Sequence, residues 1–308
     1  MHVVDVLACG RPSVDLTFLG LPCLPRLGEE YHVGGFAMNP GAGFITVNGM
    51  RRLGLRTGYA TDLGSDMFSR YILESLRALG IDETFIVHHD RDLSNITVGL
   101  SFPEDRAFIT WEADERFVGR GVLPQDLQDH HVRCLFSSCP VSPEVLDEAR
   151  RQHIPICSDT SCDREYLESE RVRVVLRQAS VFLPNCVEAC TITGKADPEQ
   201  ALLALMDCVE TAVVKLGPHG AIGGRAGCIC HVPALPVDVV DTTGAGDNFD
   251  AGFVYGLLHD LSLEQCLRCG AAAGSLSTRF VGGIKGSPSE AELFEAVARL
   301  EDLSASYS

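Results

Sequence analysis

Short apolar runs alternate with longer amphipathic stretches along most of this 308-residue chain. Brief runs that are almost entirely apolar are typical of strands buried on both faces of a sheet. We expect strands over residues 3–9, 57–60, 134–137, 154–157, 181–183 and 212–216. We expect helices over residues 40–53, 65–79, 143–152, 199–208, 247–259, 263–278 and 289–303. This alternation predicts an α/β protein with a mostly parallel central sheet and helices on both faces.

Two segments, residues 17–33 and 92–111, are rich in β-forming residues and have no helix between their strands. Residues 96–102 and 107–111 are separated by the turn-forming residues 103–106, which predicts a hairpin. We expect a small β-sheet lid built from about residues 12–36 and 92–113, lying over one end of the main sheet. Such a lid excludes water from transfer chemistry. The alternative is two surface hairpins without a role.

Composition limits the classes of partner. The chain has 42 acidic and 25 Lys or Arg residues, a net charge of −17, and is 45% hydrophobic. The apolar content is too high for a disordered chain, and the negative charge argues against nucleic acid or an anionic membrane as a partner. No apolar run is long enough to span a membrane, and residues 1–10 lack the basic start of a signal peptide. We therefore expect a cytoplasmic protein whose 13 scattered cysteines are reduced thiols.

The most informative motif is Asp-Thr-Thr-Gly-Ala-Gly-Asp-Asn-Phe-Asp-Ala-Gly, at residues 241–252. Gly244, Ala245 and Gly246 carry almost no side chain, so their amides can converge at the start of the helix that follows, and a helix N-terminus binds anions. Asp247 lies in the first turn beside such an anion. This is a suitable place for a general base that deprotonates a hydroxyl. On this motif alone, an ordinary glycine-rich turn is the alternative.

Residues 241–252 resemble the C-terminal signature of the ribokinase-like (PfkB) family of carbohydrate and nucleoside kinases. Further landmarks of that family occur in order: Gly10 with Asp15, Gly-Gly-x-x-x-Asn at 34–39, the helix-strand-turn at 53–66, Asn-x-x-Glu at 185–188 and Lys-Leu-Gly-Pro-His-Gly at 215–220. The resemblance runs from about residue 3 to 287. It implies a three-layer α/β/α body with a small β-sheet lid, forming one kinase domain over residues 1–308. The chain lacks a Walker A sequence, so a P-loop kinase is not supported.

The resemblance also implies the chemistry, which is transfer of the γ-phosphoryl group of ATP with Mg²⁺ as cofactor. The groups that act in the reaction are the base Asp247 and the anion hole of Gly244, Ala245 and Gly246. The acceptor is held by Asp15, Gly34, Gly35 and Asn39. The nucleotide is held by Asn185, Lys215, Gly217 and Gly220. The metal residues are Glu188 for magnesium and, for potassium, Asp241 and Thr243.

Simpler interpretations of several of these residues remain open. Asn185 and Glu188 have the spacing of a capping box at a helix N-terminus, and this interpretation is compatible with a role in the site. Lys215 follows an apolar strand, where a lysine often faces solvent. Asp15 is also typical of a turn and Asn39 of a helix start. Gly41 and Gly43 stand where the family more often has Ala or Ser, which we expect to alter packing and not chemistry.

The acceptor is less well defined by the sequence. Phe36, Ala37 and Met38 fill the variable positions of the Gly-Gly-x-x-x-Asn element and none is basic, which favours an unphosphorylated acceptor. Phe36, Met38, Phe108 and Trp111 either line an apolar wall of the acceptor site or belong to the core. The family favours a sugar over a nucleoside, and a silent nucleotide- or sugar-binding regulator is a further alternative. Exposed apolar strands of the lid predict a homodimer formed through it.

Overall fold

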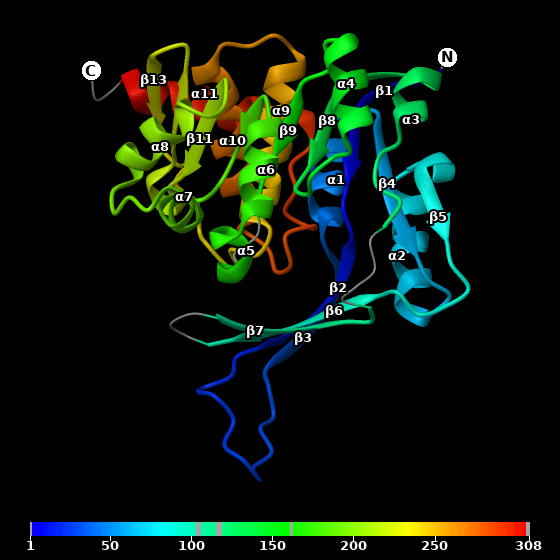
Figure 1. Cartoon of the computed structure of the whole chain (residues 1–308). Coiled ribbons are helices and arrows are strands. Elements are labelled where there is room, and N and C mark those ends of the chain that lie inside the picture. The colour runs from blue at the N-terminus through cyan, green and yellow to red at the C-terminus, as the bar shows by residue number, and fades with distance from the viewer. Residues whose placement is uncertain (1, 103–105, 115–118, 161–162, 306–308) are drawn as a thin grey trace.

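The computed structural model describes residues 2–102, 106–114, 119–160 and 163–305 and contains two sheets (Figure 1). The main sheet has nine strands in the order β13-β12-β11-β10-β9-β8-β1-β4-β5. Their bounds are β1 His2–Cys9, β4 Thr57–Leu63, β5 Ile86–His88, β8 His130–Ser137, β9 Ile156–Ser158, β10 Val181–Phe182, β11 Thr211–Lys215, β12 Ala221–Arg225 and β13 Cys228–Val232. The strands from β11 to β5 are parallel, β12 is antiparallel to β11, and β13 is antiparallel to β12. The predicted mostly parallel sheet is confirmed.

Helices cover both faces of this sheet and complete the three layers. One face carries α1 Gly43–Arg52, α2 Met67–Ala78, α9 Ala245–Leu258, α10 Leu263–Ser277 and α11 Glu290–Ala305. The other carries α3 Pro124–Asp129, α4 Pro143–Arg151, α5 Arg164–Glu168, α6 Glu170–Gln178, α7 Cys186–Thr193 and α8 Pro198–Met206. Across the described residues, no helix has both the length and the apolar character that crossing a membrane requires.

The small sheet is separate and lies beyond one end of the main sheet (Figure 1). Its order is β3-β2-β6-β7, with β3 Gly35–Ala42, β2 Pro12–Leu19, β6 Asn95–Ser101 and β7 Arg106–Glu112. Strands β2 and β6 are parallel, and the other two pairs are antiparallel. The predicted hairpin is confirmed as β6 and β7, although its turn residues 103–105 lie outside the described residues. Of residues 17–33, which we expected to be rich in strand, residues 17–19 lie in β2 and residues 20–33 form a loop.

The prediction that a helix opens with Pro40 is wrong. Pro40 lies in β3 opposite Val14, and helix α1 begins only at Gly43. The physical reason is that β3 is an edge strand, where a residue without an N–H group is tolerated. The small sheet therefore extends to Ala42, beyond residue 36 where the predicted lid segment ends.

The small sheet has two chemically different faces, because successive side chains of a strand point to opposite sides. One face, which we call the polar face, carries Ser13, Asp15, Thr17, Ala37, Asn39, Thr97, Phe108 and Thr110. The other face, which we call the apolar face, carries Leu16, Phe18, Phe36, Met38, Val98, Leu100, Ile109 and Trp111. Contacts across the strands agree, since the hydroxyls of Thr97 and Thr110 are 3.1 Å apart and the rings of Phe18 and Phe36 are 5.4 Å apart between centroids.

This arrangement corrects the interpretation of the aromatic and Met side chains. Phe36, Met38 and Trp111 are exposed on the apolar face, so they belong neither to the core nor to a wall beside Asp15. Of the four side chains, only Phe108 shares the face of Asp15.

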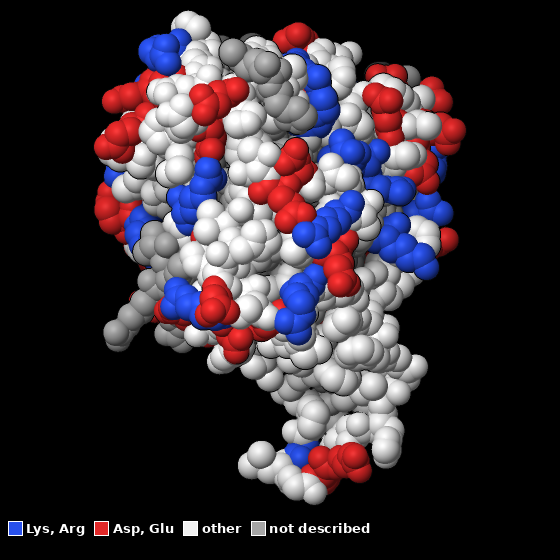
Figure 2. All heavy atoms as spheres, turned by 90° about the vertical axis from the view of Figure 1, so that its right-hand side faces the viewer, with Lys and Arg blue, Asp and Glu red and all other residues white. Residues whose placement is uncertain are grey.

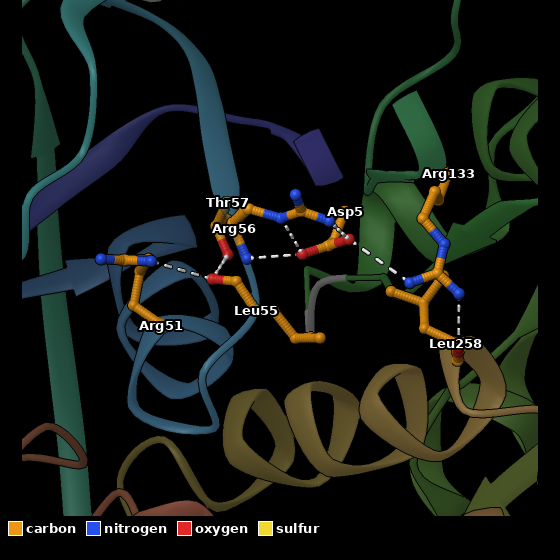
Figure 3. Close-up of polar contacts among 7 residues, drawn as sticks. All are labelled: Asp5, Arg51, Leu55, Arg56, Thr57, Arg133 and Leu258. Atoms are coloured by element: carbon orange, nitrogen blue, oxygen red, sulfur yellow. Dashed lines mark hydrogen bonds and ion pairs between the residues drawn. The ribbon is translucent and has the colours of Figure 1, made fainter. Parts of the chain in front are cut away.

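A buried carboxylate fixes the amino end of the main sheet (Figure 3). The Asp5 side chain accepts hydrogen bonds from Nε and Nη2 of Arg56, each at 2.8 Å, and from Nη1 of Arg133 at 3.3 Å. The hydrogen bonds from Arg56 are the main cause that lowers the pKa of Asp5 to about 2. The cluster joins β1 to β8 and to the turn before β4, on the edge of the sheet opposite the site described next.

Candidate active site

Three polar residues follow neighbouring parallel strands at the carboxyl edge of the main sheet. Asp159 comes directly after β9, Asn185 follows β10, and Lys215 ends β11. Carboxyl ends of parallel strands meet at one edge, where open α/β sheets bind ligands. Asn185 and Lys215 form a backbone bridge, and the Lys215 ammonium donates a hydrogen bond to Asp159 Oδ2 at 2.9 Å. The sequence analysis missed Asp159, whose only signal is a polar residue directly after an apolar strand.

Helix α9 begins at this edge with the predicted glycine-rich turn. Gly244 has a φ of +72°, and a Cβ atom there would lie 2.9 Å from the Ile45 side chain, so the turn requires glycine. The Ala245 N–H donates a hydrogen bond to the Thr242 carbonyl at 3.2 Å. The first N–H groups of a helix have no partner inside it. With the amide of Ala245 used in the turn, the amides of Gly246 and Asp247 remain for an anion.

Asp247 lies in the first turn of α9, half-buried, and accepts a hydrogen bond from Thr46 Oγ1 at 2.7 Å. Burial raises its pKa to about 6, and the charges of Asp159 and Asp15 add to this, while the hydrogen bond from Thr46 and the charge of Lys215 oppose it. A carboxyl group that ionises near neutral pH can accept a proton from a hydroxyl and release it again. The geometry therefore suits a general base.

Asp15 and Asn39 lie directly opposite each other on β2 and β3, on the polar face of the small sheet. Ser13 Oγ donates a hydrogen bond to Asp15 Oδ1 at 2.8 Å, and burial raises the pKa of Asp15. The polar face looks toward the body, because a Cβ atom at Gly282 would lie 2.4 Å from the Asn39 amide nitrogen. Neither residue stands at the turn or helix start that was the alternative.

The glycines around these two residues have different roles. A Cβ atom at Gly41 would lie 2.2 Å from Asp15 Oδ2, so Gly41 makes room for the carboxylate itself. The packing that we expected Gly41 to alter is therefore the packing around the Asp15 carboxylate, and its lack of effect on the chemistry stays a prediction. Gly34 ends the loop before β3 and Gly35 begins the strand, four residues before Asn39 and about 13 Å along the strand. The structure does not bring them next to Asp15.

Asn185 and Glu188 form the capping box that the spacing allows. Asn185 Oδ1 accepts from the Glu188 N–H at 3.0 Å, and Glu188 Oε2 accepts from the Asn185 N–H at 2.8 Å. Burial and the charge of Asp159 raise the pKa of Glu188 to about 7, against the opposing charge of Lys215. Glu188 thus caps helix α7 and at the same time lies in the electrostatic field of the site.

Lys215 does not face solvent, so that alternative is wrong. Its side chain is 9% exposed, and its ammonium contacts Asp159 and Asp250. Gly217 and Gly220 form the turn between β11 and β12. Gly220 has a φ of +87°, and a Cβ atom there would lie 1.9 Å from the Val232 carbonyl oxygen. Gly217 is exposed and also has a positive φ, of +57°, so the backbone of the turn favours glycine at both positions.

Asp241 links two loops. Its Oδ1 accepts from the N–H and the hydroxyl of Thr243, at 2.9 and 2.7 Å, and its Oδ2 accepts from the Gly282 N–H at 2.8 Å. Among the residues described, no three His, Cys, Asp or Glu side chains are arranged to hold a metal ion. The predicted metal residues thus lie in two places, Glu188 on α7 and Asp241 with Thr243 in the loop before α9.

Known proteins resemble the chain over most of its length. The family model of the pfkB family carbohydrate kinases matches residues 30–290. An ATP-dependent 6-phosphofructokinase of Thermoanaerobacterium thermosaccharolyticum is 25% identical, over 92% of this chain and 91% of that one. A 5-dehydro-2-deoxygluconokinase of Geobacillus kaustophilus is 26% identical, over 89% and 87%. The solved structure of Arabidopsis thaliana ribokinase complexed with ribose and ATP matches with a TM-score of 0.78 and 22% identity, over 96% and 99%. The chain belongs to the pfkB family of carbohydrate kinases.

Proposed function

We propose that this protein is an ATP-dependent kinase that transfers the γ-phosphoryl group to a hydroxyl of an unphosphorylated sugar. The observation that carries the proposal is the placement of Asp247 at the N-terminus of α9, with Asp15 and Asn39 facing the same space from the small sheet. Asp247 takes the proton of the acceptor hydroxyl while the hydroxyl oxygen bonds to the γ-phosphorus. The bond from that phosphorus to the bridging oxygen breaks, and ADP leaves.

Backbone groups hold the transferred phosphoryl group. The amides of Gly246 and Asp247, in the first turn of α9, and the positive end of the α9 dipole stabilise the charge on its oxygens. This explains how a protein of net charge −17 binds a nucleotide, since recognition rests on a helix terminus instead of a basic surface. The nucleotide phosphates are expected along the strand ends that carry Asn185, Lys215 and Gly217.

Oxygen ligands at this edge fit magnesium. Asp159 Oδ1 is buried and has no hydrogen-bond partner in the part of the chain that the structure describes, and Glu188 carries a further carboxylate nearby. Hard oxygen ligands are those that Mg²⁺ prefers, so Asp159 and Glu188 would hold the ion, which would neutralise phosphate charge. Potassium near Asp241 and Thr243 has less support, because both oxygens of the Asp241 carboxylate already accept hydrogen bonds.

The polar face supports an uncharged acceptor. Among the variable positions before Asn39, only Ala37 lies on that face, and it offers no cation for a phosphorylated sugar. Asp15 and Asn39 then bind acceptor hydroxyls, and the small sheet closes over them as a lid. Phe108 shares their face and is 55% exposed, so its ring is placed to stack on a sugar or a nucleobase. That ring is the observation that keeps a nucleoside as the second candidate acceptor.

The apolar face supports a homodimer formed through the small sheet. Phe36, Ile109 and Trp111 are 57%, 63% and 57% exposed, and a continuous apolar patch of this kind marks an interface. In Figure 2 the protruding part of the molecule is largely free of charged side chains except at its tip. Trp111→Glu should halve the sedimentation mass, and Leu203→Glu, at an exposed position of α8, should not. A wild-type protein that sediments as a monomer at micromolar concentration contradicts the dimer.

A panel of sugars, sugar acids and nucleosides tests the function through ADP release with MgATP. Sugar-dependent release that Asp247→Asn abolishes, and that Asp207→Asn at an exposed position leaves unchanged, supports the proposal. Turnover with nucleosides alone moves the assignment to the second candidate. Nucleotide binding without turnover on any acceptor identifies a silent regulator instead. Since the reaction draws on ATP, we place the protein in the cytoplasm.

A further inference from the structure

Lys215 is an unusual lysine in this chain. The sequence contains three lysines, and the other two, Lys195 and Lys285, are exposed. Lys215 is 8% exposed at the end of β11, where its ammonium lies among carboxylates. Removing a lysine from water is costly, and replacing a buried ion pair with apolar residues is often neutral or stabilising. Stability alone therefore does not account for this arrangement.

Two carboxylates fix the position of the ammonium. Lys215 Nζ donates to Asp159 Oδ2 at 2.9 Å and to the two oxygens of Asp250 at 3.1 and 3.3 Å. Asp250 is 0% exposed and lies on α9, three residues after Asp247. The ammonium is thus paired with carboxylates from two different elements, which compensates for the removal of its charge from water.

The ammonium lies against the first turn of α9. A Cβ atom at Gly246 would be 3.4 Å from Lys215 Nζ, so the absence of a side chain there leaves the ammonium next to the amides of the anion hole. Each anchor comes from a different element: Asp159 from the end of β9, and Asp250 from α9 itself. Helix α9 carries both Asp250, which contacts the ammonium, and the amides of the anion hole. The geometry of this one helix therefore fixes where the ammonium lies relative to a bound anion.

We propose that Asp250 and Asp159 are positioning residues that hold the Lys215 ammonium against the γ-phosphoryl group at the start of α9. Lys215 then stabilises the negative charge on the transferred group, together with the amides of Gly246 and Asp247. Asp250 touches neither nucleotide nor acceptor and acts through Lys215. The inference rests on the proposed kinase function for its kinetic consequences, but its binding consequence does not require turnover.

The binding test compares the affinity for the non-hydrolysable ATP analogue AMP-PNP with the affinity for ADP, both with Mg²⁺. Wild type should prefer AMP-PNP, and Lys215→Met should reduce that preference roughly 10- to 100-fold, as expected for a lost charge-assisted contact. Asp250→Asn should reduce it in the same direction, and the exposed control Lys195→Met should not. An equal preference in wild type, Lys215→Met and Asp250→Asn overturns the proposal, whether or not the protein turns over any acceptor.

The kinetic test uses the acceptor found in the panel. Asp250→Asn should lower kcat at least tenfold while the KM of the acceptor changes less than twofold. Lys215→Met leaves the carboxylate of Asp250 buried without its cation, which destabilises the fold. The double variant Lys215→Met/Asp250→Asn removes that charge as well and should fold better. Because Asp250 acts through Lys215, the double variant should be no slower than Lys215→Met. A purely structural Asp250 would instead lower the melting temperature of Asp250→Asn and leave the kcat of its folded fraction equal to that of wild type.

Discussion

Replacing Asp247 by Asn should remove activity and stabilise the fold. The carboxyl has a pKa of about 6 in the folded protein against 3.8 for an ordinary Asp, mainly because it is buried. At pH 7 the group is ionised in both the folded and the unfolded chain, and the folded state bears the cost of burying the charge. A pKa difference of this size corresponds to about 3 kcal/mol. Asn keeps the hydrogen bond from Thr46 without the charge.

The gain in stability should depend on pH with a definite sign. Below pH 3.8 the Asp247 carboxyl is protonated in both states, so wild type and Asp247→Asn should have nearly equal free energies of unfolding. Between pH 3.8 and 6 the unfolded chain releases the proton first, so wild type loses stability relative to the variant as the pH rises. Above pH 6 the difference should stay constant at up to about 3 kcal/mol.

Urea unfolding of both proteins at pH 4, 5, 6 and 7 measures this difference directly. Because every other titrating group is common to the two proteins, the comparison isolates Asp247. Asp207→Asn, at an exposed position, should show no pH-dependent difference. The reasoning fails if Asp247→Asn is less stable than wild type at pH 7, or if the difference shrinks as the pH rises from 4 to 6.

Three further predictions test other parts of the structure. The kcat/KM of the acceptor should fall as the pH drops below about 6, because Asp247 of the free enzyme becomes protonated. A flat kcat/KM profile from pH 5 to 8 would exclude Asp247 as the base. Asp5→Asn should lower the free energy of unfolding at pH 7 by about 1–2 kcal/mol, because the variant loses the charge that Arg56 and Arg133 bind. It should leave kcat unchanged. Equal urea midpoints for variant and wild type would refute this prediction. Tyr59→Phe should leave the free energy of unfolding unchanged or raise it by about 1 kcal/mol, because the buried Tyr59 hydroxyl finds no partner among the described residues. Thermal unfolding measures this. A clearly lower free energy of unfolding in the variant would indicate that the hydroxyl binds a water molecule.

Local patterns in the sequence were sufficient for much of the fold. The apolar runs predicted, to within a few residues, the strands that the structure shows as β1, β4, β8, β9, β10 and β11. Most positions of these strands are buried on both faces, so most of their residues are apolar and the runs are visible in the sequence. Helix α7 was not predicted as a helix because it has only eight residues and no clear apolar stripe, although its capping box was recognised. The glycine-rich turn was predictable because it depends on local backbone geometry.

The charged cluster around Lys215 could not be predicted in the same way. Lys215, Asp159 and Asp250 are separated by 35 residues or more along the chain, and only the order of β9 and β11 with α9 brings them together. A buried lysine after an apolar strand has the same local sequence as an exposed one. What distinguishes them is the presence of two carboxylates from other elements, which is a property of the folded protein.

The two proposed roles of the small sheet follow from one strand register. Asp15 pairs with Asn39, and Phe18 with Phe36, so the polar groups share one face and the aromatic rings the other. A shift of β3 by one residue would exchange the faces of all its side chains relative to β2, placing Met38 beside Asp15 and Asn39 in the apolar surface. Gly41 opposes such a shift, because a residue with a Cβ at that place collides with Asp15 Oδ2. The acceptor site and the proposed dimer surface therefore depend on the same pairing, and a substitution that disturbs it should affect both activity and assembly.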